Sequence, residues 1–494
     1  MKNVVSYIAI LTLILGLGSC SDFLDRDSSN EISQDDLYKT VEGAEMALTG
    51  LYSKLTESVY LGENMIVVPE FKSGNIKFNP ALGGSSINRT QFVASYEFSH
   101  VAQEIDSEGD VIHSFYQYLY DILYQANNII EKVPGVPTSN VAKRDQIFGE
   151  ALAIRAMLHF DLTRLYAQPY IYGKNGRHWG VVNLTQNISF LDQPARARLY
   201  ENYDQIIEDL TLAIDLMKAP RKGSIREAYF SAEAAKALLA RVYLYKGDWL
   251  MAKEYADQVI KSGAYRLIDN EYLVMAWQLS QPSMEDIFMV DLSNNTLTMI
   301  SEIYGIESTG VFLNGQLQVV YKTERAAVAT SDLLALYDEG DVRLQLFANS
   351  SPSNADSPRI TRKFSNASLK ERFTPVIRLA EIYLIRAEAS AELGQNVQAR
   401  SDLNTIRKRA NPNASNIISS GEALIEEIMK ERRRELCFEG HTYFDLIRKG
   451  KGIVRPDFNG AQNGDVEFPS DLLVLPIRQK ALDYNENLIQ NPGY

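Results

Sequence analysis

The sequence has few of the residues that most often build disulfides, metal centres or nucleophilic sites. It contains 2 cysteines, Cys20 and Cys437, which are too few for a disulfide framework. Its 5 histidines do not occur in HExxH or another close ligand spacing, so a catalytic zinc site has little support. No GxSxG, P-loop or GxGxxG motif occurs in its usual context. These absences favour a protein without a catalytic centre or cofactor; whether it binds a structural metal stays open.

Basic residues are also in deficit. Lys and Arg number 50 against 63 Asp and Glu, which makes the formal net charge -13. Phosphate binding needs basic patches, so this balance argues against nucleic acid as the main partner. The remaining composition, 45% hydrophobic and 23% charged, is ordinary for a globular protein, and 494 residues can bury a large core.

The longest apolar run lies at the N-terminus and is too short for a comfortable membrane span. Lys2 precedes a mostly apolar stretch over 4–17, and Leu-Gly-Ser-Cys follows at 17–20. This resembles a bacterial lipobox, in which cleavage before Cys20 leaves a thiol that carries lipid. We expect a lipoprotein signal peptide at 1–19 and an acylated N-terminus with an acidic tether at 20–34, which would anchor the chain without spanning the bilayer. The alternative is a plain secretory signal.

Two stretches have the pattern of a helical hairpin repeat. Residues 234–260 carry apolar positions at helical spacing on both sides of Gly247 and resemble a tetratricopeptide (TPR) unit. Residues 375–410 repeat the pattern at the same offsets, with Gly394 at the position of Gly247. One such hairpin cannot bury its own apolar face, so we expect further pairs to stack on it. An unrelated helical hairpin is the alternative.

The rest of the chain alternates between helical and irregular stretches. Apolar periodicity predicts further helices over 40–56, 114–133, 145–166, 200–217 and 422–438, and a strand over 286–292. The helices in 145–217 could pair as a TPR-like unit with an expanded turn. Stretches rich in Gly, Asn and Pro or Thr at 63–99 and 293–325 predict long loops, which often carry function. No clean linker interrupts 35–494, which we interpret as one domain.

Four motifs resemble the SusD/RagB family, the surface glycan-binding lipoproteins of Bacteroidetes. They are TRLYAQPY at 163–170, YDEGDVR at 337–343, ERRRELCFEGHTYFDLIR at 431–448 and LPIRQKALDYNENLIQNPGY at 475–494. The lipobox agrees with them, so the resemblance covers the whole chain. Arg478 and Cys437 depart from the residues that the family pattern leads us to expect.

This resemblance implies a mainly α fold: a TPR-like scaffold of about four helix pairs, near 145–217, 230–262 and 375–410 among others, with a loop-rich ligand-binding half that contains short strands. It implies a lipid-anchored protein of the outer membrane that faces the outside. It also implies a SusC-like TonB-dependent transporter as partner, to which the lipoprotein delivers an oligosaccharide or a peptide without chemical change.

The resemblance places the ligand side on the loops at 63–99 and 293–325. Aromatic rings can cover the apolar C–H faces of sugars, while Asn, Asp and Arg satisfy their polar edges. The predicted ligand-binding residues are Phe78, Asn79, Arg89, Tyr304, Phe312, Asn314 and Tyr321, with Trp179 and Trp277 in reserve.

An enzyme is the competing interpretation. Glu435 and Glu439 lie four apart on a predicted helix beside three arginines, which could form a catalytic cluster. Glycosidases need two carboxylates on opposite sides of a substrate, whereas these two share one helix face. We therefore favour a salt-bridged helix end that locks Tyr443, Phe444 and Asp445 into the core. The predicted function is non-catalytic glycan binding; a peptide-binding relative, an unusual glycoside hydrolase and a pure TPR adaptor are the alternatives.

Overall fold

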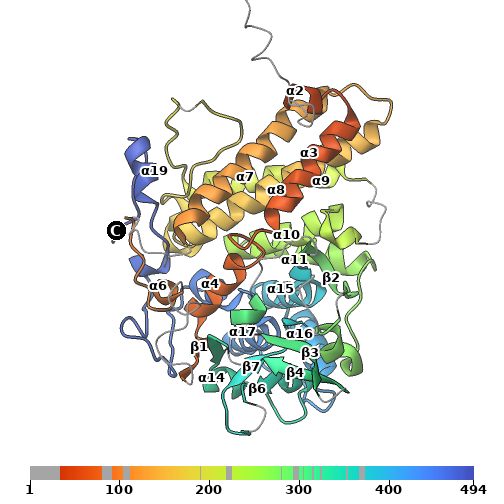
Figure 1. Cartoon of the computed structure of the whole chain (residues 1–494), viewed down its shortest axis with the longest axis vertical. Helices are drawn as coiled ribbons and strands as arrows, with labels where there is room; N and C mark the ends of the chain where they lie inside the picture. The colour runs from red at the N-terminus through yellow and green to blue at the C-terminus, as the bar shows by residue number, and fades with distance from the viewer. Residues whose placement is uncertain are drawn as a thin grey trace, which may run out of the picture.

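Figure 1 shows the computed structural model of the chain. The structure describes residues 34–80, 92–103, 112–189, 191–218, 225–279, 281–292, 300–303, 305–313, 316–322, 325–351, 354–366 and 373–494. The predicted signal peptide, Cys20 and nearly all of the tether lie outside these ranges. Within them, no helix combines the length and apolar character needed to cross a bilayer.

The longer helices stack as consecutive pairs. They are α3 (Val41–Leu55), α7 (Ile112–Lys132), α8 (Val141–Tyr166), α9 (Leu199–Leu216), α10 (Ala232–Lys246), α11 (Trp249–Lys261), α15 (Leu379–Glu392), α16 (Asn396–Ala410) and α17 (Glu422–Leu436). Helix α3 packs on α7, α8 on α9, α10 on α11 and α15 on α16, and α11 also packs on α15. The expected TPR-like, mainly helical scaffold is confirmed.

The repeat that the sequence predicts is visible in the turns and interfaces of the two hairpins. Gly247 and Gly394 both adopt the left-handed conformation, with φ of 77° and 71°, which ends the first helix of each pair. The alanines at the matched positions are fully buried, which lets the helices approach closely. These alanines are Ala240 and Ala252 in the first hairpin, and Ala387 and Ala399 in the second.

Shorter elements connect and surround these pairs, and most of the strands lie away from α3, α7 and α9 (Figure 1). The short helices are α2 (Gln34–Leu37), α4 (Asn64–Ser73), α6 (Val93–Tyr96), α12 (Leu273–Ala276), α13 (Ile300–Ile303), α14 (Ser331–Leu334), α18 (Thr442–Arg448) and α19 (Gln479–Tyr484). The strands are β1 (Ile76–Phe78), β2 (Asp286–Asp291), β3 (Ile306–Leu313), β4 (Gln316–Lys322), β5 (Ala327–Ala329), β6 (Phe347–Asn349), β7 (Arg359–Thr361), β8 (Ser365–Asn366) and β9 (Phe373–Arg378). In Figure 1, most strands gather at the end opposite α3, α7 and α9.

The strands form small sheets rather than one continuous layer. β1 pairs with β5 and β2 with β9, both antiparallel, and β6 pairs with β7 in the same sense. β3 and β4 form an antiparallel hairpin, and β3 also pairs in parallel with β8. Each pairing except β3–β4 and β6–β7 joins segments far apart in sequence, so these sheets tie the inserted segments to one another.

Two predicted loops contain more regular structure than expected. The stretch 63–99 includes α4, β1 and α6, and 293–325 includes the β3–β4 hairpin. All ten residues of α4 are buried, so the helix lacks the one-sided apolar pattern that identifies surface helices. The second hairpin also starts later than predicted, because 375–378 belong to β9 and the helix begins at Leu379.

Candidate ligand-binding site

The structure brings the two predicted ligand-side segments together. The Asn79 backbone N–H donates to the Ala326 carbonyl at 2.9 Å, and Asn79 Nδ2 donates to the Arg325 carbonyl at 3.0 Å. Arg325 Nε in turn donates to the Gly305 carbonyl at 3.0 Å. Because β1 and β5 also pair directly, the end of β1 is fixed against both ends of the β3–β4 segment.

Phe78 and Asn79 lie at the base of this junction rather than on its surface. Phe78 is only 1% exposed, and its ring packs 5.1 Å from Phe71 and 4.7 Å from Tyr96. Asn79 is 3% exposed, and its side chain is engaged with Arg325. Neither side chain is exposed to solvent in this structure, and a ligand role for Phe78 and Asn79 stays a prediction that their burial does not favour.

The other predicted ligand residues lie on or beside the hairpin. Phe312 is in β3 and pairs with Leu317 across the ladder, and Tyr321 is in β4 and pairs with Ser308. Tyr304 and Asn314 flank these strands in sequence but lie outside the described residues, as does Arg89. A ligand role for Arg89, Tyr304, Phe312, Asn314 and Tyr321 stays a prediction.

The two reserve tryptophans have different surroundings. Trp277 packs over buried cations, with Lys363 Nζ 4.9 Å and the Arg378 guanidinium carbon 5.1 Å from its ring centre. Trp179 is 37% exposed, and the Arg198 guanidinium lies 3.7 Å from its ring centre. Trp277 is therefore half-buried against these cations, whereas Trp179 is accessible on the helical side.

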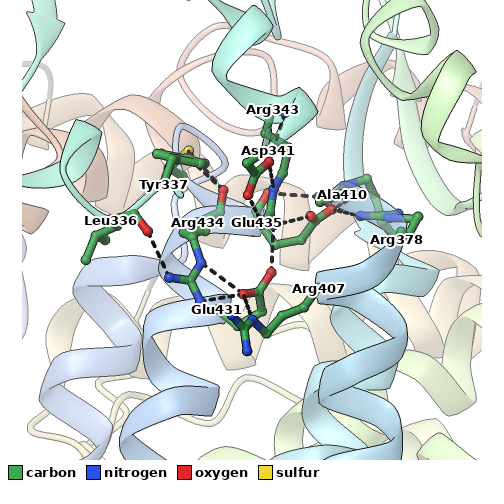
Figure 2. A network of polar contacts seen from close by, with 12 residues as sticks. Leu336, Tyr337, Asp341, Arg343, Arg378, Arg407, Ala410, Glu431, Arg434 and Glu435 are labelled. Atoms are coloured by element: carbon green, nitrogen blue, oxygen red, sulfur yellow. Dashed lines mark hydrogen bonds and ion pairs between the residues drawn. The ribbon is translucent and has the colours of Figure 1, made fainter. Parts of the chain in front are cut away.

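A buried ion network joins the strand-rich half to the helix pairs, and Figure 2 shows part of it. At its centre, the Glu435 carboxylate accepts from Arg343 at 2.9 Å, Arg378 at 3.2 Å and Arg409 at 2.6 Å. Glu435 lies on α17, and its three cationic partners come from the 3₁₀ turn Val342–Leu346, from β9 and from α16. One carboxylate thus holds three separate elements.

The network is close to neutral. Arg378 also binds Glu439 at 2.7 Å and Glu285 at 3.0 Å, and Lys363 binds Glu439 at 2.6 Å. Its buried cations and anions are five each: Arg343, Lys363, Arg378, Arg409 and Arg434 against Glu285, Asp341, Glu431, Glu435 and Glu439. This pairing confirms that Glu435 and Glu439 are salt-bridged. The prediction that they share one helix face is wrong, because α17 ends at Leu436, and their partners come from other elements rather than from the three neighbouring arginines.

The electrostatics of these two carboxylates are those of permanent anions. Burial alone would raise the pKa of Glu435, but the guanidinium groups of Arg409, Arg378 and Arg343 outweigh it and hold the pKa well below its ordinary value. Burial would also raise the pKa of Glu439, but the charges of Arg378 and Lys363 outweigh burial and lower this pKa. The general acid of a glycosidase needs a raised pKa, so this pair does not have the electrostatics of that role.

Acid should weaken this fold below about pH 4.5, because buried carboxylates must then be protonated. Burial raises the pKa of Glu388, but Arg448, at 2.6 and 2.7 Å, outweighs burial and lowers it from 4.5 to about 2. A lowered folded-state pKa stabilises the protein above pH 4.5, and this contribution, about 3 kcal/mol, is lost as pH falls towards 2. Thermal unfolding measured from pH 7 to pH 2.5 tests this. The Glu388→Gln variant should be less stable than the wild type at pH 7, and its stability should depend less on pH below 4.5. If the stability of both proteins fell with pH at the same slope, the lowered pKa of Glu388 would be contradicted.

No metal centre accompanies the network. Across the part of the chain that the structure describes, no three His, Cys, Asp or Glu side chains gather in a way that could hold a metal ion. The sequence pointed to Glu435 and Glu439 but not to Arg378 and Arg409. The sequence held only a weak signal for Arg378, which is a charged residue directly before the apolar start of α15.

These features define a class of protein: a TPR-like helical scaffold with a strand-rich half inserted into it and tied down by buried ion pairs. A family profile described as "SusD family" matches residues 357–494, and one described as "Starch-binding associating with outer membrane" matches residues 22–244. The chain belongs to the SusD/RagB family.

Individual relatives agree with this assignment. SusD-like protein P38 of Formosa agariphila is 24% identical, with 100% of this chain and 99% of that protein covered. Starch-binding protein SusD of Bacteroides thetaiotaomicron is 33% identical over 133 residues, which are 26% of this chain and 23% of that protein. The crystal structure of a SusD superfamily protein from Bacteroides vulgatus superposes with a TM-score of 0.77 at 29% identity, with 92% and 99% of the two chains covered.

Proposed function

We propose that this protein is a non-catalytic lipoprotein of the outer membrane that binds oligosaccharides at the cell surface and delivers them to a SusC-like TonB-dependent transporter. The observation that carries the proposal is the junction of Asn79 with Arg325, which ties the end of β1 to the segment that contains the β3–β4 hairpin. Family membership and the starch-binding description of the matched profile support the glycan as ligand. No cofactor is required for this function.

The ligand residues that we propose lie on and around the hairpin. Phe312 and Tyr321 are in its two strands, and Tyr304 and Asn314 flank them in sequence. Aromatic rings bind the apolar face of a sugar, and an amide satisfies its hydroxyl groups. Buried Phe78 and Asn79 would set the position of these residues without touching the sugar.

Truncating the hairpin aromatics should abolish glycan binding without unfolding the protein. We expect the mature lipoprotein, held in detergent, to be retarded in native gels cast with at least one neutral polysaccharide from a panel of starch, laminarin and β-mannan. Tyr304→Ala and Phe312→Ala should each lose this retardation, because one stacked ring contributes about 1 kcal/mol or more to a weak complex.

The matched control is Tyr484→Ala, which removes an aromatic side chain that is 76% exposed on α19. It should migrate like the wild type. If Tyr304→Ala and Phe312→Ala were both retarded like the wild type, the proposed site would be contradicted. Enrichment of peptides from a protein digest, with no glycan retarded, would favour a peptide-binding relative. New reducing ends from a retarded glycan, lost on mutation of one carboxylate, would establish a hydrolase.

Membrane attachment rests on Cys20 and the preceding apolar segment. A diacylglycerol and an added acyl chain bury many CH₂ groups at about 0.8 kcal/mol each, which makes anchoring essentially permanent. Cys20→Ala should therefore move the protein from the outer-membrane fraction to the soluble fraction. Wild-type protein that is soluble and carries no acyl chains would contradict the anchor. Co-purification of a large TonB-dependent barrel with the wild type tests the partnership separately.

A further inference from the structure

A large open pocket lies on the helical side of the molecule, away from the β3–β4 hairpin. Its volume is about 670 Å³, within the range of small-molecule sites. It forms where the connection from α8 to α9, residues 167–198, replaces the short Gly247 turn of the α10–α11 pair. The side chains that matter for binding are Tyr170, Arg177, Arg198, Tyr200, Asp204 and Lys246.

The pocket is positively charged in a chain of net charge -13. Arg177, Arg198 and Lys246 face one lining carboxylate, Asp204, which lies 3.2 Å from Lys246 and has a side chain that is 61% exposed. A second carboxylate, Glu201, lies beside the pocket and accepts from the Tyr200 hydroxyl at 3.1 Å, so cations still outnumber anions there. The Arg177 side chain is exposed and forms no hydrogen bond or ion pair within the described ranges. Of the three cations, Arg177 is therefore the one whose side-chain charge the fold does not use.

Local structure fixes this charge in place. The Arg198 guanidinium stacks on Trp179, and its Nη1 donates to the Arg177 carbonyl at 3.2 Å. The turn before Arg177 has two consecutive residues in the left-handed region, Asn175 with φ 54° and Gly176 with φ 64°. A Cβ on Gly176 would lie 2.6 Å from the Tyr170 ring, so only glycine allows this turn to close against the tyrosine.

We propose that this pocket is a second binding site, for an acidic saccharide that carries carboxylate or sulfate groups. Guanidinium groups recognise carboxylate and sulfate oxygens, and neighbouring aromatic rings cover the C–H face of a sugar. The concave shape and the mixture of tyrosines with cations fit a short saccharide, whereas a protein partner would need a wider contact surface. The site does not depend on the hairpin and is separate from the proposed neutral-glycan site.

Calorimetry on the mature lipoprotein in detergent at low salt tests the proposal with two acidic probes, trigalacturonate and a ι-carrageenan tetrasaccharide. At least one should bind. The double variant Arg177→Gln, Lys246→Gln should weaken that binding by about tenfold or more, since two charge-assisted contacts are lost. If trigalacturonate is the ligand, its fully methyl-esterified form, which has the same backbone without charge, should bind about tenfold more weakly.

Two controls separate binding in this pocket from general attraction to positive charge and from binding at the hairpin. Lys174→Gln removes an exposed positive charge beside the pocket and should leave the affinity within about twofold. The double variant should keep its retardation by a neutral polysaccharide, and Tyr321→Ala should keep its affinity for the acidic probe. The proposal is overturned if neither probe binds, if the double variant binds like the wild type, or if hexaglutamate binds more tightly with the same residue dependence, which would indicate an acidic protein segment.

Discussion

Replacing Arg378 with methionine is expected to lower the free energy of unfolding by about 3–5 kcal/mol, because it removes a cation that three buried carboxylates share and leaves the network with one excess buried negative charge. Arg378 is 5% exposed and contacts Glu285, Glu435 and Glu439. Methionine fills much of the same volume, so the loss would come from charge rather than from a cavity. Replacing the whole network with apolar residues could leave the stability unchanged, whereas removing a single charge from it is costly.

Urea unfolding of Arg378→Met and the wild type measures this loss. The matched control is Arg226→Met, which changes an arginine whose side chain is 54% exposed and pairs with Glu227. Exposed pairs contribute about 0–1 kcal/mol, so this control should unfold almost like the wild type. Adding Glu439→Gln to Arg378→Met should recover part of the stability, since it removes the excess negative charge and makes the numbers of buried cations and anions equal again. Equal midpoints for Arg378→Met and its control would show that the network tolerates an excess buried negative charge.

The helical half of this fold could be predicted from sequence because its signals are local. Helical spacing of apolar residues, a glycine at each turn and alanines at fixed offsets all lie within one hairpin, as Gly247 and Gly394 illustrate. Helix α4 could not be predicted in this way, because every one of its residues is buried and no polar face marks its period. The strand pairings could not be predicted from sequence either, since β1 pairs with β5, which lies about 250 residues later in the chain.

The candidate site was predictable as a region but not residue by residue. Composition predicted two irregular segments, the family resemblance placed the ligand side in them, and the structure brings those segments together through Asn79 and Arg325. The chemistry of an aromatic side chain is the same whether it packs in a core or lines a site, so sequence alone could not separate Phe78 from Phe312. Likewise, the pairing of Glu435 with Arg343 and Arg409 depends on contacts between distant elements.

Phe78→Ala should distinguish support of the site from contact with the ligand. Phe78 is fully enclosed by an aromatic cluster with Phe71 and Tyr96, so its truncation should cost about 3–5 kcal/mol in the free energy of unfolding. It should weaken glycan binding only indirectly, by loosening Asn79 and with it the base of the β3–β4 hairpin.

Two companion variants give this experiment its contrast. Phe78→Leu keeps most of the buried apolar volume and should recover most of the stability and the binding, with a residual loss of about 1–1.5 kcal/mol. Tyr321→Ala, in β4, should lose glycan retardation while its urea midpoint stays close to that of the wild type. The opposite result, a stable Phe78→Ala protein whose binding is abolished and is not restored by leucine, would mean that Phe78 reaches the sugar directly. The cluster around Phe71 would then have to open during binding, because Phe78 is only 1% exposed in this structure.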